Sequence, residues 1–198
     1  MEKARILVIE DLADLAVGLR DTLTALGYEV PAVLASGEEA VRVAADLRPD
    51  LVIMDIGLSG ELDGVDAATR IRADHDVPVI YLTARSSEEI LQRAKATEPY
   101  AFLLKPFPEQ ELVSAVELAL HRHKLDRELR ESTERFRLYY DKAPLAYQSL
   151  DRDGRLIAVN PAWLEMLGYS REDAVGRPFA DLVSPCLLYT SPSPRDRS

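Results

Sequence analysis

The strongest constraint on the fold of this chain is an alternation of short apolar runs with segments of helical periodicity. The five runs are Arg5–Ile9, Glu29–Leu34, Leu51–Met54, Val79–Thr83 and Ala101–Leu104. Four of them are almost continuously apolar, as expected for strands that are buried on both faces of a parallel sheet. The second run contains Pro31, which removes a donor from the hydrogen-bond ladder and therefore predicts an edge strand.

The segments between the runs carry helix signals. A helix over Asp14–Leu26 would place its leucines on one face, and Gly27 suits its carboxyl end. Ser36 to Glu39 and Ser86 to Glu89 both match a capping box, and further helices are predicted over Asp63–Arg72 and Glu109–His123. Right-handed crossovers then predict an α/β fold, with a doubly wound five-stranded parallel sheet and helices on both faces.

Polar residues stand at the carboxyl ends of four of these runs: Glu10 and Asp11, Asp55, Thr83, and Lys105. Because ligands of doubly wound sheets bind at that edge, we expect these side chains to converge. Three neighbouring carboxylates raise one another's pKa unless a cation lies between them, and oxygen ligands without His or Cys favour Mg²⁺ over Zn²⁺. An ammonium and a hydroxyl beside the metal would hold an anion, so the edge suits a phosphoryl group on or near a carboxylate.

Each of these residues also has a simpler interpretation when it is taken alone. An acidic pair after a strand is commonly a helix cap or a solvated turn. Lys105 before Pro106 fits an ordinary loop start, and Thr83 fits a strand end. Their coincidence at successive strand ends favours the functional interpretation.

Four segments resemble the receiver domain of two-component response regulators: Ile6–Asp11, Leu51–Asp66, Val79–Ala84 and Phe102–Phe107. The resemblance covers about residues 3–121 and implies a flavodoxin-like fold. It implies that Asp55 accepts a phosphoryl group from a histidine kinase or a phosphotransfer protein. It also implies Mg²⁺ as cofactor, with ligands and phosphoryl contacts as follows: Glu10, Asp11, Asp55 and the backbone carbonyl of Gly57 for the metal, and Lys105 and Thr83 for the phosphoryl oxygens.

The resemblance further implies a cis Lys105-Pro106 peptide bond and a switch that involves Thr83 and an aromatic residue of the last strand. That aromatic residue is Phe102, where many relatives have Tyr, so the switch would depend on packing without a hydroxyl. Phe102 equally fits plain core. Where the family often has Gly-Ala, this chain has residues 97–100, Thr-Glu-Pro-Tyr, which is a departure on the output face.

The helical pattern continues from Glu109 to about Tyr140, past the expected end of a receiver. Heptad steps along it meet Ala115, Leu118, Arg122, Leu125, Leu129, Ser132, Phe136 and Tyr139. Two interpretations stay open: a homodimer formed through the 109–140 helix, or a single amphipathic helix that packs on its own domain. His121 and His123 would point about 200° apart, cannot chelate one metal, and are expected to be solvated.

Residues 134–185 resemble the first half of a PAS sensory domain. A turn at Asp151–Gly154 would join strands near Ala146–Leu150 and Leu156–Val159, and a helix would span Asn160–Leu167 and end at Gly168. Trp163 and Tyr169 are expected to be core residues that hold no cofactor. The predicted organisation is a receiver over 1–121, a helical linker over 122–133, a truncated PAS domain over 134–185 and a disordered tail over 186–198. That tail resembles a translated sequencing adapter and is expected to be non-native.

Composition narrows the function classes. The 24 Lys and Arg against 34 Asp and Glu give a net charge of −10, which argues against nucleic-acid binding by bulk charge. No apolar run approaches the ~18–20 residues that span a bilayer, and the first residues lack a signal peptide, so we expect a cytoplasmic protein that does not contact membranes. The single cysteine, Cys186, excludes a disulfide framework. No kinase core is recognisable, so we expect no enzyme activity beyond phosphorylation and dephosphorylation at Asp55.

Three rival functions fit the sequence less well. A flavodoxin-like oxidoreductase needs a phosphate loop rich in Ser, Thr and Gly after the first strand, where Glu10, Asp11 and Leu12 stand. An aspartate-nucleophile phosphatase needs a second acid two residues after the nucleophile, where Gly57 stands. A pseudo-receiver that acts only in docking would usually have lost Asp55 or Lys105.

Overall fold

The computed structural model describes residues 3–84 and 88–182, apart from the side chain of Glu89. The chain divides into two compact units, Met1–Arg127 and Glu128–Ser198, which are described in turn. The capping box predicted to start at Ser86 and the tail predicted over 186–198 lie outside the described residues.

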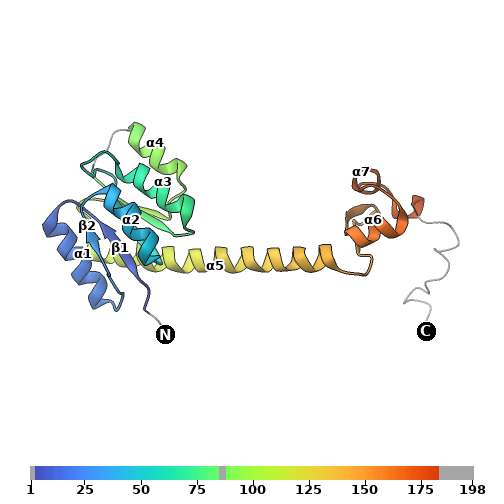
Figure 1. Cartoon of the computed structure of the whole chain (residues 1–198), viewed down its shortest axis with the longest axis horizontal. Coiled ribbons are helices and arrows are strands. Elements are labelled where there is room, and N and C mark those ends of the chain that lie inside the picture. The colour runs from blue at the N-terminus through green and yellow to red at the C-terminus, as the bar shows by residue number, and fades with distance from the viewer. Residues whose placement is uncertain (1–2, 85–87, 183–198) are drawn as a thin grey trace. The chain divides into compact units, whose positions relative to one another are not determined.

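The first unit contains a sheet whose strands β1 and β2 are labelled in Figure 1. The sheet is parallel and has the strand order β2-β1-β3-β4-β5. The strands are β1 (Ile6–Ile9), β2 (Val33–Leu34), β3 (Leu51–Asp55), β4 (Val79–Thr83) and β5 (Ala101–Leu104). The doubly wound five-stranded fold expected from the sequence is therefore confirmed. β2 is short and lies at the edge, as Pro31 predicted.

Helices cover both faces of the sheet and bury two separate layers of apolar side chains. The helices are α1 (Ala13–Ala25), α2 (Gly37–Leu47), α3 (Gly64–Asp74), α4 (Glu88–Ala96) and α5 (Glu109–Lys142). Side chains of α2, α3 and α4 pack with Leu7 and Ile9 on one face, while α1 and α5 pack with Ile6 and Val8 on the other. This alternation along β1 follows from the two-residue period of a strand. Among the described residues, no helix has the length and apolar character that a membrane crossing requires.

The predicted helix ends are formed by the expected residues. Ser36 Oγ accepts a hydrogen bond from the amide of Glu39 at 3.4 Å, and Asp63 Oδ1 accepts one from the amide of Asp66 at 2.8 Å. Gly27 takes a positive φ of 92° just after α1, a conformation that glycine adopts without steric cost. These local signals fix where α1, α2 and α3 begin or end.

A polar cluster fastens β5 to α5 and corrects one expectation. The Tyr100 hydroxyl lies 3.1 Å from His123 Nδ1 and donates to Asp126 Oδ2 at 3.2 Å. The Arg122 guanidinium carbon lies 5.6 Å from the centre of the Tyr100 ring. His123 was expected to be solvated, but it is half-buried because the Tyr100 side chain contacts it. Tyr100 belongs to the segment that departs from the family pattern.

The second unit contains an antiparallel hairpin and short helices. These elements are β6 (Gln148–Leu150), β7 (Leu156–Val159), α6 (Pro161–Leu167), α7 (Arg171–Ala174) and the 3₁₀ helix η1 (Phe179–Asp181). Trp163 is buried and stacks on Tyr169 with ring centres 6.3 Å apart, so both are core residues as predicted. Gly168 ends α6 in the left-handed conformation.

Asn160 holds the second unit together from the inside. It is fully buried, and its Oδ1 accepts hydrogen bonds from the amides of Tyr147 and Trp163 at 2.8 and 3.0 Å. Its Nδ2 donates to the carbonyls of Tyr140 and Leu145 at 3.1 and 2.8 Å. The oxygen and the nitrogen of this side-chain amide therefore make two hydrogen bonds each, as a buried amide requires.

The contact between α3 and the end of β3 yields a prediction. A Cβ added at Gly64, the first residue of α3, would lie 1.9 Å from the carbonyl oxygen of Asp55 and 3.0 Å from Ile56 Cα. Both atoms belong to backbone, so Gly64→Ala should lower the free energy of unfolding by about 2–3 kcal/mol in urea denaturation.

Gly18→Ala is the matched control. Gly18 lies inside α1 with no atom within 4 Å of the added Cβ, so this change should raise stability by up to about 1 kcal/mol. Equal stability of the Gly64 variant and the wild type would contradict the proposed close packing.

Candidate functional site

The predicted polar residues meet at the carboxyl-terminal edge of the sheet. Carboxylate oxygens of Glu10, Asp11 and Asp55 all lie within 4.8 Å of one another. Glu10 and Asp55 are 2% and 5% exposed, whereas Asp11 is exposed to solvent. They converge because β1 and β3 are neighbours in the sheet, so that residues following the two strands end side by side.

Lys105 joins two of these carboxylates. Its Nζ lies 2.6 Å from Glu10 Oε2 and 2.8 Å from Asp55 Oδ2, and its side chain is 13% exposed. The Lys105-Pro106 peptide bond is cis, as the family resemblance implied. One buried ammonium thus offsets part of the negative charge of three acids.

The surroundings of Glu10 shift the pKa of its carboxyl. Burial raises the pKa of its carboxyl above 4.5, the nearby negative charge of Asp55 raises it further, and the hydrogen bond from Lys105 opposes both effects. An opposite charge beside such a carboxyl favours its ionised form. The cluster therefore has the electrostatics of a cation site.

The loop after β3 is held against the site by hydrogen bonds. The amide of Gly57 donates to Asp55 Oδ1 at 3.1 Å, which fixes that carboxylate oxygen. From α2, Glu38 Oε1 accepts a bond from the amide of Leu62 at 2.8 Å. Backbone hydrogen bonds, from its own amide and from Leu62, lower the pKa of Glu38. Glu38, which the sequence placed only within a capping box, therefore positions this loop.

Ser59 is a site residue that the sequence did not reveal. Its hydroxyl donates to Asp11 Oδ2 at 3.2 Å. The two residues are 48 positions apart and Ser59 lies in a loop without periodicity, so no pattern in the sequence pointed to the contact.

Thr83 and Phe102 lie on the neighbouring strands β4 and β5. Thr83 is 5% exposed and its hydroxyl donates to the carbonyl of Ala84. The half-buried Phe102 stacks on Tyr81, with ring centres 5.6 Å apart, and the Tyr81 hydroxyl lies 3.0 Å from Thr97 Oγ1. Tyr81 was not singled out from the sequence, because an aromatic residue in a buried strand resembles ordinary core. The switch role of Thr83 and Phe102 stays a prediction.

Arg93 ties α4 to the start of α3. Its guanidinium lies 2.8 Å from Asp63 Oδ2 and 2.6 Å from Asp66 Oδ1. Burial alone would raise the pKa of Asp63, but the bonds from the Asp66 amide and from Arg93 lower it overall. Because these groups are partly exposed, the pairs contribute orientation more than stability.

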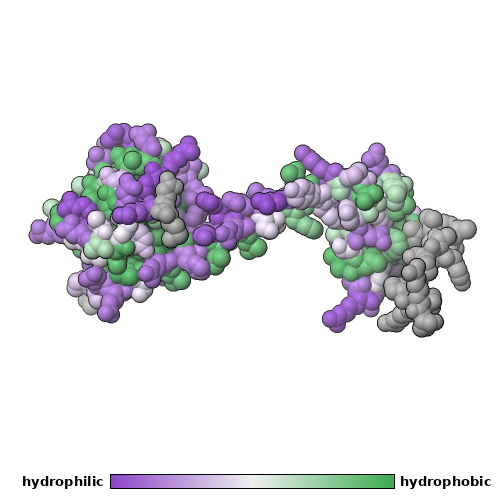
Figure 2. Space-filling view, turned by 90° about the horizontal axis from the view of Figure 1, so that it is seen from below, coloured by the Kyte–Doolittle hydropathy of each residue, from purple (hydrophilic) through white to green (hydrophobic). Residues whose placement is uncertain are grey.

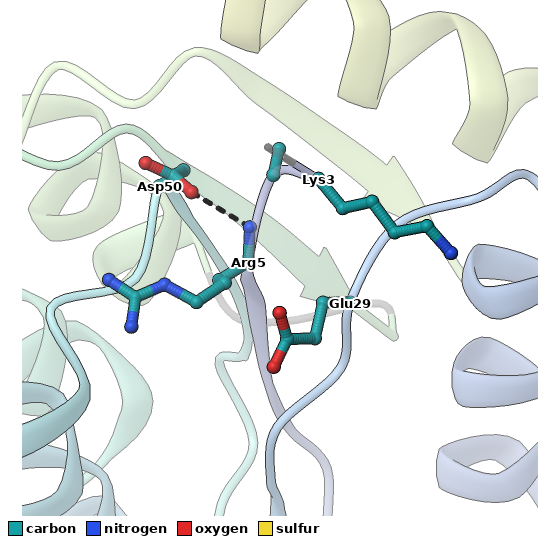
Figure 3. A pocket seen from close by; sticks show the side chains of 5 residues that line it. Lys3, Arg5, Glu29 and Asp50 are labelled. Atoms are coloured by element: carbon teal, nitrogen blue, oxygen red, sulfur yellow. Dashed lines mark hydrogen bonds between the residues drawn. The ribbon is translucent and has the colours of Figure 1, made fainter. Parts of the chain in front are cut away.

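A second pocket opens at the opposite, amino-terminal end of the strands (Figure 3). It is lined by Lys3, Ala4, Arg5, Glu29 and Asp50. The amide of Arg5 donates to Asp50 Oδ2 at 2.8 Å, and the Arg5 guanidinium donates to the carbonyl of Arg48 at 2.9 Å. Arg5 and Asp50 thus bond to the chain's own backbone here, at the end of the strands that lies opposite to the carboxylate cluster.

The fold and the site together define a class: doubly wound α/β domains with an acidic pocket and a lysine at the strand ends. The family model described as "Response regulator receiver domain" matches residues 6–117, and the model described as "PAS fold" matches residues 140–197. The chain therefore belongs to the response regulator receiver family, with a PAS-like fold after the receiver.

Individual relatives agree with this assignment. The chain is 39% identical over 118 residues to the transcriptional regulatory protein PdtaR of Mycobacterium tuberculosis, covering 60% of this chain and 57% of the relative. It is 37% identical over 123 residues to the DNA-binding response regulator MtrA of Mycobacterium leprae, covering 61% and 53%. The chain thus spans little more than half the length of the curated relatives that it matches.

Two of the solved structures that the chain resembles are matched over nearly their whole length. The signal receiver domain of a modulated diguanylate cyclase from Desulfovibrio desulfuricans has a TM-score of 0.61 at 42% identity, covering 63% of this chain and 99% of that one. The N-terminal domain of a response regulator/sensory box/GGDEF protein from Carboxydothermus hydrogenoformans has a TM-score of 0.57 at 32% identity, covering 62% and 98%.

The raised pKa of Glu10 generates a prediction for stability. Since its pKa in the folded chain exceeds the unfolded value, the unfolded state releases its proton first, and stability falls as pH rises from about 4.5 through the folded pKa. Glu10→Gln lacks this loss, so its stability relative to the wild type should increase across that window in urea denaturation without Mg²⁺.

The control exchanges an acid outside the cluster. Glu61→Gln, in the loop after β3 and outside the carboxylate cluster, is the control for the loss of one acidic side chain. A pH-independent difference between Glu10→Gln and the wild type would show that Glu10 titrates normally.

Proposed function

We propose that the first unit accepts a phosphoryl group on Asp55 from the phosphohistidine of a histidine kinase or a phosphotransfer protein. The observation that carries this proposal is the position of Lys105 Nζ, 2.8 Å from Asp55 Oδ2 and 2.6 Å from Glu10 Oε2, within the cluster of three carboxylates. An ammonium at this place can stay beside Asp55 while negative charge is added to it. The histidine kinase partner follows from the family, whose members act in two-component systems.

The donor set fits a magnesium ion. All side-chain donors are carboxylate oxygens, close enough for one small hard cation, and burial together with the nearby charge of Asp55 raises the pKa of Glu10. Glu10, Asp11, Asp55 and the backbone carbonyl of Gly57 would hold the ion. When bound, Mg²⁺ supplies positive charge that offsets the charge of the phosphoryl oxygens.

The residues of the chain account for the transfer as follows. A carboxylate oxygen of Asp55 forms the new oxygen–phosphorus bond while the nitrogen–phosphorus bond of the phosphohistidine breaks and the imidazole keeps that electron pair. The amide of Gly57 orients the carboxylate through Oδ1, and Lys105 neutralises charge on the transferred oxygens. The buried position of Asp55 limits access of water to the acyl phosphate.

We further propose that Thr83 and Phe102 respond to the phosphate. Thr83 ends β4 beside Asp55 at the end of β3, so its hydroxyl can exchange the Ala84 carbonyl for a phosphoryl oxygen. Phe102, stacked on Tyr81, would then change its packing. The absence of a hydroxyl on Phe102 makes packing the basis of this response.

The proposal extends to the rest of the chain. We propose that α5 couples the receiver to the PAS-like unit, and that phosphorylation and dephosphorylation at Asp55 are the only catalysis in the described residues. The name of the Carboxydothermus protein places a sensory box after a response regulator in the same order. A cytoplasmic location and the lack of nucleic-acid contact, in line with the net charge of −10, stay predictions.

Phosphorylation of Asp55 can be tested with a small donor. The full chain incubated with acetyl phosphate and Mg²⁺ should gain the mass of one phosphoryl group by intact mass spectrometry, and Asp55→Asn should gain none. Asp50→Asn, just before the first residue of β3, is the control and should be phosphorylated like the wild type. Equal uptake by the Asp55 variant, or no uptake by the wild type, would refute the proposal.

Metal binding can be tested separately. Asp11→Ala removes one proposed ligand, so the affinity for Mg²⁺ should fall at least tenfold in a calorimetric titration, about 1.4 kcal/mol. Asp14→Ala, an exposed acid of α1 outside the cluster, should bind as the wild type does. An unchanged affinity of the Asp11 variant would place the metal elsewhere.

A further inference from the structure

The three carboxylates of the cluster are held in place in different ways. Glu10 lies 2.6 Å from Lys105 Nζ and accepts a hydrogen bond from the amide of Leu12 at 3.3 Å. Asp55 lies 2.8 Å from the same Nζ and accepts a hydrogen bond from the amide of Gly57 at 3.1 Å. Both side chains are buried, and each is fixed by a cation and by a backbone amide that is close to it in sequence.

Asp11 is held in another way. It is exposed to solvent, and among the described residues the donor to its carboxylate is the hydroxyl of Ser59, which lies 3.2 Å from Oδ2. Figure 2 shows hydrophilic residues over much of the visible surface of the first unit, so exposure and polarity alone do not distinguish this pair. The pair is distinguished by its place, because it connects one carboxylate of the cluster to the loop after β3.

The loop after β3 is anchored on both sides of Ser59. Leu58 is 7% exposed and packs into the core, and the amide of Leu62 donates to Glu38 Oε1 at 2.8 Å. Between them, Gly60 has a φ of 153°, which residues with a side chain rarely adopt. A Cβ at this glycine would lie 3.2 Å from both carboxylate oxygens of Glu38. The core and α2 therefore determine where the Ser59 hydroxyl lies.

We propose that Ser59 is a positioning residue for Asp11, whose carboxylate it holds in the orientation that binds Mg²⁺. The inference rests on the proposed function, in which Asp11 is one of the metal ligands. A carboxylate has about four lone-pair sites on its two oxygens, so Asp11 can accept a hydrogen bond and bind a cation at the same time. Hydrogen-bonding partners of metal ligands typically contribute about 10- to 100-fold to metal affinity.

A neutral donor suits this role. An exposed side chain loses rotamer freedom when it binds a metal, and a hydrogen bond that already fixes the side chain reduces that cost. A second ammonium at this place would repel the metal, since Lys105 already brings one positive charge into the cluster. The hydroxyl of Ser59 orients the carboxylate and leaves its negative charge available to the cation.

The role of Ser59 is tested with two substitutions that differ in a single group. Ser59→Thr keeps the hydroxyl, whereas Ser59→Val has a methyl group in its place on a side chain of the same shape. In a calorimetric titration of the full chain with Mg²⁺, Ser59→Thr should bind as the wild type does. Ser59→Val should bind about tenfold more weakly, at the low end of the range for such partners because the contact is exposed.

A double-mutant cycle tests whether Ser59 acts through Asp11. The Asp11→Ala variant lacks the carboxylate that Ser59 holds, so adding Ser59→Val to it should leave the affinity for Mg²⁺ unchanged. A general loss of loop structure would instead lower the affinity in both backgrounds, because Gly57 belongs to the same loop. Urea denaturation of each variant checks that the chain is folded during the titration.

The outcomes separate the role of Ser59 from the metal site itself. Equal affinities of Ser59→Thr and Ser59→Val, or a loss caused by Ser59→Val that persists in the Asp11→Ala background, would overturn the role of Ser59 alone. A wild type that does not bind Mg²⁺, or an affinity that Asp11→Ala does not change, would overturn the proposed metal site and the role of Ser59 with it.

Discussion

The ion pairs of Lys105 with Glu10 and Asp55 are the interaction on which the site of this protein depends. Two carboxylates with almost no exposure would each cost several kcal/mol to bury unpaired. A cation within hydrogen-bond distance of both offsets much of this cost, and Lys105 lies 2.6 and 2.8 Å from them. The parallel sheet brings the three side chains together, since β1, β3 and β5 all run in the same direction and end at the same edge.

The single positive charge of Lys105 does not balance the three carboxylates of the cluster. Asp11 is exposed and bonds to Ser59, while the pKa of Glu10 is raised by burial and by Asp55. The folded chain therefore keeps a site that is incomplete by charge, and a further cation bound there would stabilise it. Three contacts hold this site in place. The Gly57 amide bonds to Asp55, Glu38 bonds to the amide of Leu62 in the loop after β3, and Gly64 packs against the backbone of Asp55 where a side chain would clash.

The parts of the fold that could be predicted from the sequence are those fixed by local patterns. Apolar runs gave the strands of the sheet, Pro31 gave the edge, and Ser36 and Asp63 gave helix starts. The convergence of Glu10, Asp55 and Lys105 followed from the rule on strand ends. Contacts between distant segments carried no such signal: the bonds of Ser59, Glu38 and Arg93 depend on loop paths, and the burial of His123 depends on Tyr100.

The strand β5 connects the two main features of the first unit. Lys105 follows its carboxyl end and pairs with the acids, while Tyr100 precedes its amino end and bonds to His123 and Asp126 on α5. Both residues are tied to a strand of four residues whose hydrogen bonds to β4 hold it rigidly in register. Because Tyr100 bonds to α5, the strand that precedes the charge-compensating lysine also fixes that helix on its own domain.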